Sequence, residues 1–230
     1  MKIIGNYSYG SRVNGTYTEI SDFDSGSVVF SGPGTIIDLN KTRRQPNTNN
    51  VKKEDGDDKE QLELITWCRN LYAPSLNMLE KVYTFKFSDE VGNYSPSLFS
   101  YLISQNFMWK PYLFRCASYA ENCKTSAKGI RQATLALDTC KFQYENRQFL
   151  VDPAFWVNQK IPISFFMDQY RNFDLEHDTQ TLEEYQRDCT RRILELRTLA
   201  ENEPFDKAQR DRRETTIVEF LFSMMKSLPV

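Results

Sequence analysis

The sequence is poor in the residues that bind metals and transfer protons. Its 230 residues include one histidine, His177, in a polar stretch typical of exposed side chains rather than of a general base. Zinc ligands occur as Cys or His pairs about two to four residues apart, whereas the closest two of the five cysteines, Cys116 and Cys123, are seven apart. We therefore expect no metal site and no cofactor. The cysteines are odd in number and fall on apolar-periodic positions, which favours reduced thiols in the core.

Sequence signals for catalysis, export and membrane insertion are also lacking. The chain has neither a phosphate-binding glycine loop of the G-x-x-x-x-G-K type nor a G-x-S-x-G nucleophile motif, so we expect no enzyme activity. It has no run of about 18 apolar residues that could span a bilayer as a helix. It turns polar directly after Ile3 and Ile4 and so lacks the apolar segment of a secretory signal. We expect a protein that is cytoplasmic or virion-associated, has no membrane span and is not secreted.

Composition and residue patterns divide the chain into three regions. Hydrophobic residues make up 40% of the sequence, enough for a sizeable core. Residues 1–39, rich in Gly, Ser, Thr, Tyr and Val, predict a β-rich arm or small β element, with β-prone runs at 27–30 and 35–39. Residues 40–61 predict a charged hinge, and residues 62–230 predict a helical domain that ends in an apolar C-terminal helix. The expected fold class is mainly α (α+β), a helical core domain with a small N-terminal β element or extended arm.

Apolar residues at three- and four-residue spacing locate the helices of the larger region. Asp57 and Asp58 are candidate caps for the first of these helices. The alternating segment 84–88 predicts a strand that pairs with the N-terminal β element. The expected helices, separated by prolines and polar breaks, cover residues 64–72, 76–83, 112–122, 126–144 and 163–173, and one more helix starts at Ser95 and Pro96 and carries the apolar residues of 98–103.

The C-terminal part carries the strongest helix signals. Thr181 and Glu184 form a capping box, in which the Thr side chain accepts from an early helical amide and Glu184 reaches back to the Thr181 amide. The helix that they begin is expected to end at Glu203, before Pro204. A last helix ends in the segment 217–225, which is too short to cross a bilayer and too apolar to be exposed. We expect its side chains to lie in the chain's own core or, as an oligomer interface, on a neighbouring copy: Phe220, Phe222, Met224 and Met225.

Positive charge is concentrated in two segments of a chain whose net charge is only −2. Residues 41–53 carry a net charge of +5, and residues 106–147 carry seven basic and three acidic side chains, so the remainder of the chain carries −11. Cationic segments of this kind bind nucleic-acid phosphates by releasing counterions. The candidate nucleic-acid contacts are Lys41, Arg43, Arg44, Lys52 and Lys53 in the first segment and a helical stripe of Lys124, Lys128 and Arg131 in the second. The alternative interpretation of the first segment is a solvated linker.

Aromatic side chains flank the helical stripe in the sequence. Side chains of this type stack bases in proteins that bind single strands, but at helical spacing they more often form the core. The residues concerned are Trp109, Tyr112, Tyr119, Phe142 and Tyr144.

These patterns favour a non-enzymatic structural subunit that self-associates. In a coat-like or nucleocapsid-like role, the termini would contact neighbouring copies and the cationic segments would bind nucleic acid, RNA among others, by its backbone and without sequence preference. The alternative hypothesis is a monomeric adaptor or regulatory protein whose cationic segments bind an acidic protein partner. No motif in the sequence indicates a known family.

Overall fold

The fold is taken from a computed structural model of the whole chain. It describes residues 1–15, 22–32, 48–52, 58–71, 74–91, 99, 104, 107–153, 179–205, 207–208, 212, 215–216, 219–220, 222–223 and 226. The chain forms two compact units. The first consists of Met1–Tyr72, Asn77–Phe107 and Asp206–Val230, and the second of Ala73–Leu76 and Met108–Phe205.

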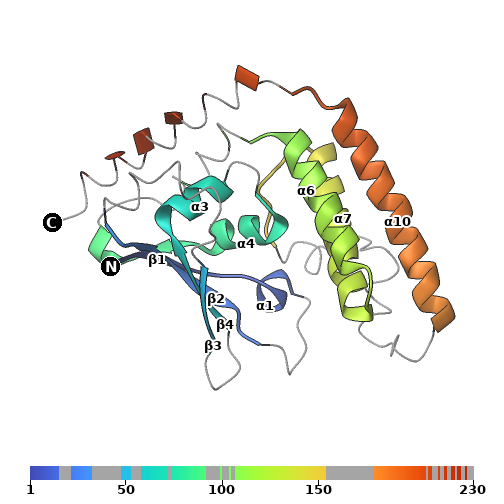
Figure 1. Cartoon of the computed structure of the whole chain (residues 1–230), viewed down its shortest axis with the longest axis horizontal. Coiled ribbons are helices and arrows are strands. Elements are labelled where there is room, and N and C mark those ends of the chain that lie inside the picture. Colours follow the sequence, from blue (N-terminus) through green and yellow to red (C-terminus); the bar gives the residue numbers. More distant parts are fainter. Residues whose placement is uncertain are drawn as a thin grey trace. The chain divides into compact units, whose positions relative to one another are not determined.

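The first unit is built on a five-stranded sheet of order β3-β4-β2-β1-β5 (Figure 1). The central pair, β1 and β2, is antiparallel; β4 runs parallel to β2, and the edge strands β3 and β5 are antiparallel to their neighbours. The strands are β1 (Lys2–Ser8), β2 (Ser25–Phe30), β3 (Thr48–Lys52), β4 (Asp58–Glu63) and β5 (Lys86–Phe87). This small sheet lies in the N-terminal part of a chain that is otherwise mainly helical, as the sequence predicts. The strand expected at 84–88 forms as β5 and pairs with β1.

Two of the five strands arise from residues 40–61, which the sequence analysis interprets as a hinge. Both β3 and β4 lie wholly or partly in this range, and Asp58, expected to cap a helix, is the first residue of β4. Glu60 of β4 tolerates its position in the sheet because it has partners there. Glu60 accepts a hydrogen bond from Tyr7 Oη at 3.0 Å and pairs with Lys81, both of which are distant in sequence.

Aromatic rings form the core of the first unit beside the short helices α3 (Leu64–Asn70) and α4 (Leu76–Thr84). Trp67 is fully buried, and its ring centroid lies 5.2 Å from that of Phe85 and 5.6 Å from that of Phe99. Gly5 on β1 allows this packing, because a Cβ atom there would lie 2.3 Å from the Phe85 ring. Pairs of offset or edge-on rings at these distances add about 0.5–1.5 kcal/mol beyond their buried area.

Helix α4 also fixes the segment that follows β1, which includes α1 (Ser11–Asn14). The buried carboxylate of Glu80 accepts hydrogen bonds from Gly10 N at 3.0 Å and from Asn14 Nδ2 at 3.2 Å. Thr84 Oγ1 accepts from Ser8 N at 3.0 Å. The 3-10 helix η2 (Asp89–Val91) follows β5.

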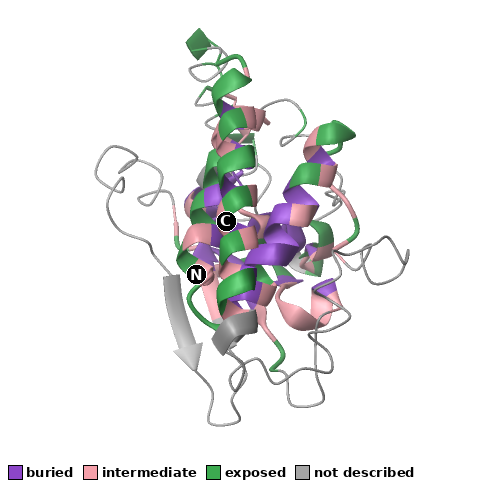
Figure 2. Ribbon diagram, turned by 90° about the vertical axis from the view of Figure 1, so that its right-hand side faces the viewer, coloured by how far each residue is buried: buried purple, intermediate pink, exposed green. Residues whose placement is uncertain are grey.

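The second unit consists mainly of three helices, α6 (Trp109–Cys123), α7 (Ala127–Glu145) and α10 (Thr179–Asn202), which pack against one another. Figure 2 shows their buried faces in purple and the exposed face of α10 in green. Small side chains at the contacts let the helices approach closely. The buried alanines are Ala117 and Ala120 on α6, Ala133 and Ala136 on α7, and Ala200 on α10.

The helix boundaries agree with the sequence prediction for α7 and for the end of α10, and differ in two places. The first is the start of α6, which precedes Pro111 and places this proline in the first turn, where its missing amide hydrogen is not needed. The second is the start of α10 at Thr179, so Thr181 lies inside the helix rather than at its cap. The five cysteines are free, and all but the partly exposed Cys123 are buried, as expected.

Some predictions lie outside the described residues. These are the strand at 35–39, the helix at 163–173 and most of the helix at 98–103, of which Phe99 is described and helical. No described helix is both long enough and apolar enough to cross a membrane.

Candidate anion-binding pocket

The predicted nucleic-acid contacts are divided between the two units. Lys52 is the last residue of β3 in the first unit, whereas Lys124, Lys128 and Arg131 belong to the second unit, at and just after the corner between α6 and α7. The four other cations of the first segment, Lys41, Arg43, Arg44 and Lys53, lie outside the described residues.

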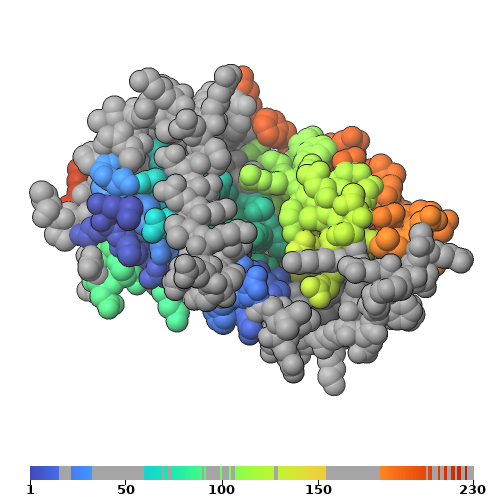
Figure 3. Space-filling view, turned by 60° about the horizontal axis from the view of Figure 1, so that its bottom comes forward, coloured from blue at the N-terminus to red at the C-terminus, as the bar shows by residue number. Residues whose placement is uncertain are grey.

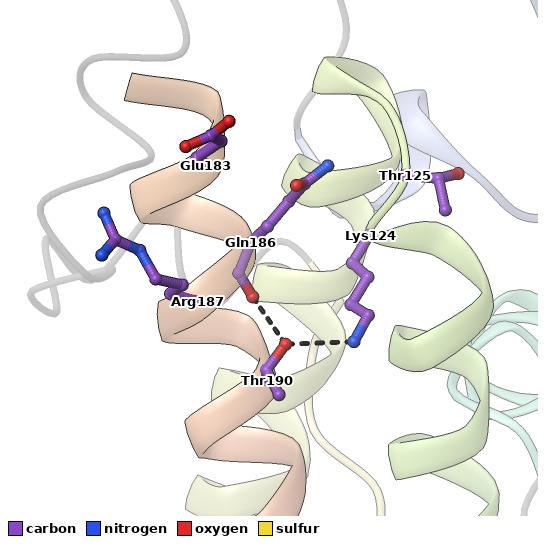
Figure 4. Close-up of a pocket in the computed structure, with 6 residues that line it drawn as sticks. All are labelled: Lys124, Thr125, Glu183, Gln186, Arg187 and Thr190. Atoms are coloured by element: carbon purple, nitrogen blue, oxygen red, sulfur yellow. Dashed lines mark hydrogen bonds between the residues drawn. The ribbon is translucent and has the colours of Figure 1, made fainter. Parts of the chain in front are cut away.

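Lys124 lines a polar pocket of about 460 Å³ between the α6–α7 corner and α10. Lys124 and Thr125 come from the corner, and the other lining residues, Glu183, Gln186, Arg187 and Thr190, come from successive turns of α10 (Figure 4). The surface over these helices is shown in Figure 3, with α6 and α7 in green and α10 in orange.

The sequence builds the α6–α7 corner through a cap and a glycine. Ser126 is the N-cap of α7, and its hydroxyl accepts a hydrogen bond from Gly129 N at 3.0 Å. A Cβ atom on Gly129 would lie 1.8 Å from the carbonyl oxygen of Cys123, so only glycine allows the end of α6 to approach the first turn of α7 this closely. The corner thereby holds Lys124 and Thr125 beside α10.

Lys124 is held in a defined position by residues of two helices. Its Nζ donates to Thr190 Oγ1 at 3.0 Å, and Thr190 in turn donates to the backbone carbonyl of Gln186 at 2.8 Å (Figure 4). The same Nζ lies 2.7 Å from Glu121 Oε1, and Arg197 Nη2 lies 3.8 Å from the other oxygen of this carboxylate. The hydrogen bond from Lys124 holds the pKa of Glu121 below its usual value. Two cations thus share one carboxylate, which leaves a net positive charge at the edge of the pocket.

The other charged groups of the pocket lie on α10. Glu183 and Arg187 are both exposed, and the guanidinium of Arg187 lies on the side of α10 away from Lys124 (Figure 4). Arg187 is therefore a rim residue, and Lys124 is the cation that points at the polar groups of the pocket. The Lys124 ammonium has three donors, two of which bond to Thr190 and Glu121, so one remains for a small anionic group in the pocket.

The structure removes most of the aromatic residues considered for base stacking. Tyr112 is fully buried and donates a hydrogen bond to Gln143. Tyr144 and Trp109 pack edge to face, with centroids 5.7 Å apart, and the guanidinium of Arg147 covers both rings. Tyr119, which is 40% exposed, remains a candidate.

The predicted oligomer-interface residues have different environments. Phe220 is partly exposed and packs edge to face on buried Phe99 of its own unit, with centroids 5.9 Å apart. Phe222 is 51% exposed, so of the two expected environments its side chain does not have the core of its own chain. Met224 and Met225 lie outside the described residues.

Sequence reasoning found Lys124 but missed its partners on α10. Gln186 and Thr190 are four residues apart and lie on one face of the helix, a spacing that is visible in the sequence but common in any helix. Nothing in the sequence indicates that this face meets Lys124, because 66 residues separate Thr190 from Lys124. Among the described residues, no three His, Cys, Asp or Glu side chains are grouped so that they could hold a metal ion. No protein-family model matches the chain, and no curated protein shows significant similarity to it.

Proposed function

We propose that this chain is a non-enzymatic structural subunit that self-associates and binds nucleic-acid backbone without sequence preference, in a coat-like or nucleocapsid-like role. The observation that carries the proposal is the fixed ammonium group of Lys124 in an open polar pocket at the N-terminal end of α7. Helix N-termini favour anions, and an ammonium group beside hydroxyl and amide donors suits a phosphate oxygen.

Two further cations follow Lys124 on α7. Lys128 lies in the first turn of this helix and Arg131 lies in the next. A backbone that crosses the corner would therefore meet several positive charges in succession, and each neutralised phosphate would release counterions. Tyr119 on α6 is 40% exposed, and stacking of a base on such a ring does not depend on sequence.

The test is the salt dependence of binding to a labelled oligouridine of about 20 nucleotides, measured by fluorescence anisotropy from about 50 to about 200 mM salt. Lys124→Gln and Arg131→Gln should each weaken binding and lower the slope of log K against log salt by about 0.7 for each phosphate that the variant no longer neutralises. Lys141→Gln is the matched control, because Lys141 is an exposed lysine of α7 whose ion pair, with Glu145, lies near the opposite end of the helix. Equal effects of the three substitutions would show diffuse attraction rather than a site.

The adaptor hypothesis gives a different result in the same assay. A monomer that binds an acidic protein should bind labelled poly-glutamate in preference to oligouridine, with the same sensitivity to Lys124→Gln. Light scattering after size exclusion, at low and high salt, measures the molar mass and so tests self-association. A 27 kDa species at every concentration and salt would contradict self-association.

A further inference from the structure

Helix α10 has an exposed stripe on the side opposite its buried face. The buried side packs in the second unit through Tyr185, Cys189, Ile193, Leu196 and Ala200. The opposite side is exposed along the helix, as the green face of α10 shows (Figure 2). We call the exposed residues that recur at spacings of three and four the outer stripe: Glu184, Arg187, Arg191, Leu194, Thr198 and Glu201.

The outer stripe differs from an ordinary solvated helix face at its centre. Leu194 is 57% exposed, more than any other large hydrophobic residue of the second unit among those described. It stands near the middle of the C-terminal half of α10, with stripe residues one and two turns away on both sides. Leu194 is the one apolar residue of the stripe, so a partner helix that lies along it would have a single apolar contact layer, with charged and polar residues on both sides.

The order of charges along the stripe selects the partner and its direction. Arg187 lies seven residues before Leu194 and Glu201 seven residues after it. In an antiparallel pair of α10 helices with Leu194 on the two-fold axis, Arg187 of each copy faces Glu201 of the other. A parallel pair would place Arg187 against Arg187 and Glu201 against Glu201, which is unfavourable. We infer that the outer stripe of α10 is a self-association surface that binds a second copy of this chain in antiparallel register about Leu194.

Arg191 could repel its equivalent in the second copy, but its charge is neutralised by ion pairs within its own chain. Arg191 lies one turn from Leu194, so the arginines of two copies approach the axis together. Its Nη2 lies 2.6 Å from Asp188 Oδ1, and its Nη1 pairs with Glu195. These ion pairs offset the repulsion between the two copies, and the methylene stems of Arg191 remain available to cover Leu194.

The size of the contact sets its strength. The 24 residues of α10 extend about 36 Å, and one pair of such helices with a single leucine layer buries less than a standard stable interface. The contact is therefore weak in a single pair of molecules and depends on concentration. Such a contact suits a subunit that assembles through several contacts at once.

The inference rests on the self-association that we propose above, and sedimentation equilibrium of the full chain without nucleic acid tests both. Leu194→Glu should raise the dissociation constant by about tenfold or more, because it sets two carboxylates on the axis. Arg187→Glu and Glu201→Arg should each weaken association by about tenfold, and the double variant should restore it, since the exchanged charges again face each other. Lys141→Glu on α7 is the matched control and should leave association unchanged.

A cross-linking experiment fixes the register. Leu194→Cys should form a covalent dimer under mild oxidation, whereas Gln132→Cys, at an exposed position of α7, should not. If the wild type self-associates but the stripe variants keep its mass, or if the double variant fails to restore it, the α10 surface is wrong and self-association stands. If the wild type is a monomer at all concentrations, both proposals fail. Circular dichroism confirms that each variant is folded.

Discussion

Arg147 donates a hydrogen bond from Nη2 to Oε1 of Glu203 at 2.7 Å, and this ion pair joins the end of α7 to the end of α10. Tyr144 donates to the same carboxylate oxygen at 2.6 Å. The Arg147 guanidinium lies 4.3 Å from the centroid of the Tyr144 ring. Lys110, in the first turn of α6, donates to the backbone carbonyl of Glu203 at 3.2 Å. Glu203 therefore joins α6, α7 and α10 at one end of the second unit.

Removing the Glu203 carboxylate should destabilise the second unit. In Glu203→Ala, Tyr144 and Arg147 lose their shared acceptor, and we expect the free energy of unfolding to fall by about 1–2 kcal/mol. The loss is modest because the Arg147 side chain is 54% exposed and water replaces part of the contact. Urea denaturation followed by far-UV circular dichroism measures it. Asn202→Ala, at the exposed position directly before Glu203, is the matched control, and an equal loss there would contradict the role of Glu203.

The contribution of Glu203 should also depend on pH. Burial raises its pKa, but the hydrogen bonds from Arg147 and Tyr144 outweigh burial and hold the pKa below the usual value for Glu. A carboxyl group with a lowered folded-state pKa stabilises the fold above its unfolded pKa of about 4.3, and the contribution is lost as the pH falls through the folded pKa. The difference in unfolding free energy between wild type and Glu203→Gln should therefore be full at neutral pH and shrink below about pH 4. A difference that does not change with pH would exclude this account.

The sequence predicts the helices of the second unit well because their signals are local. The buried face of α10 repeats every three or four residues, from Tyr185 to Ala200, and Pro204 ends it. By contrast, β1 has no clean alternation, since its pairing with β2 shifts register between Ile3 and Gly5. At this bulge the neighbouring residues Ile4 and Gly5 are both buried, so the period of two fails there.

The sequence does not predict β3, β4 or the pocket at Lys124, and the reason differs from that for β1. The polar residues of β4 find their partners far along the chain, as Glu60 does with Tyr7 and Lys81, 53 and 21 residues away. A short stretch of sequence does not include such distant partners, so its polar residues are predicted to be exposed to solvent. The position of Lys124 against Thr190 is of the same kind. Charge patterns therefore indicate that a residue is cationic, but only the fold shows which cations already have partners.

Glu80 should make the first unit less stable as the pH rises. Burial raises its pKa, and this outweighs the hydrogen bonds from Gly10 and Asn14 and the charge of Lys81, which lower it; Asp24 raises it further. A carboxyl group with a raised folded-state pKa binds its proton more tightly when folded. Stability is therefore lost as the pH rises from the unfolded pKa of about 4.3 toward the folded pKa.

Glu80→Gln isolates this effect, because glutamine has the same shape, stays neutral and keeps an oxygen that can accept from Gly10 or Asn14. Relative to wild type, the variant should gain stability as the pH is raised above about 4.3. Urea titrations followed by tryptophan fluorescence, which reports on buried Trp67, measure the difference. Asp89→Asn, which removes a carboxylate from an exposed position of η2, is the matched control. If the difference in unfolding free energy between Glu80→Gln and wild type did not change with pH, burial would not raise the pKa of Glu80.

Gly129→Ala should destabilise the protein, although the same change in an ordinary helix stabilises it by about 1 kcal/mol. The new Cβ would lie 1.8 Å from the carbonyl oxygen of Cys123, so the α6–α7 corner has to open. We expect a loss of about 1–3 kcal/mol, measured by thermal and urea denaturation, together with weaker oligouridine binding because Lys124 moves. Gln132→Ala, on an exposed part of the same helix, is the control. A more stable Gly129→Ala variant would show that the corner is looser than the structure indicates.

The ion pair between Asp138 on α7 and Arg192 on α10 should be strongly coupled, because both side chains are mostly removed from solvent, with 19% and 13% of their surfaces exposed. Arg192 Nη1 also lies 3.7 Å from Asp188 Oδ2. Removal of one partner from a buried pair leaves a charge without compensation, so Asp138→Leu and Arg192→Met should each cost about 3–5 kcal/mol. The double variant replaces the pair with apolar side chains and should be less destabilised than the sum of the single changes by about 2 kcal/mol or more.

The wild type, the two single variants and the double variant form a double-mutant cycle, and urea denaturation measures the unfolding free energy of each. Additive losses would show that solvent screens the pair and that apolar packing alone holds α7 against α10.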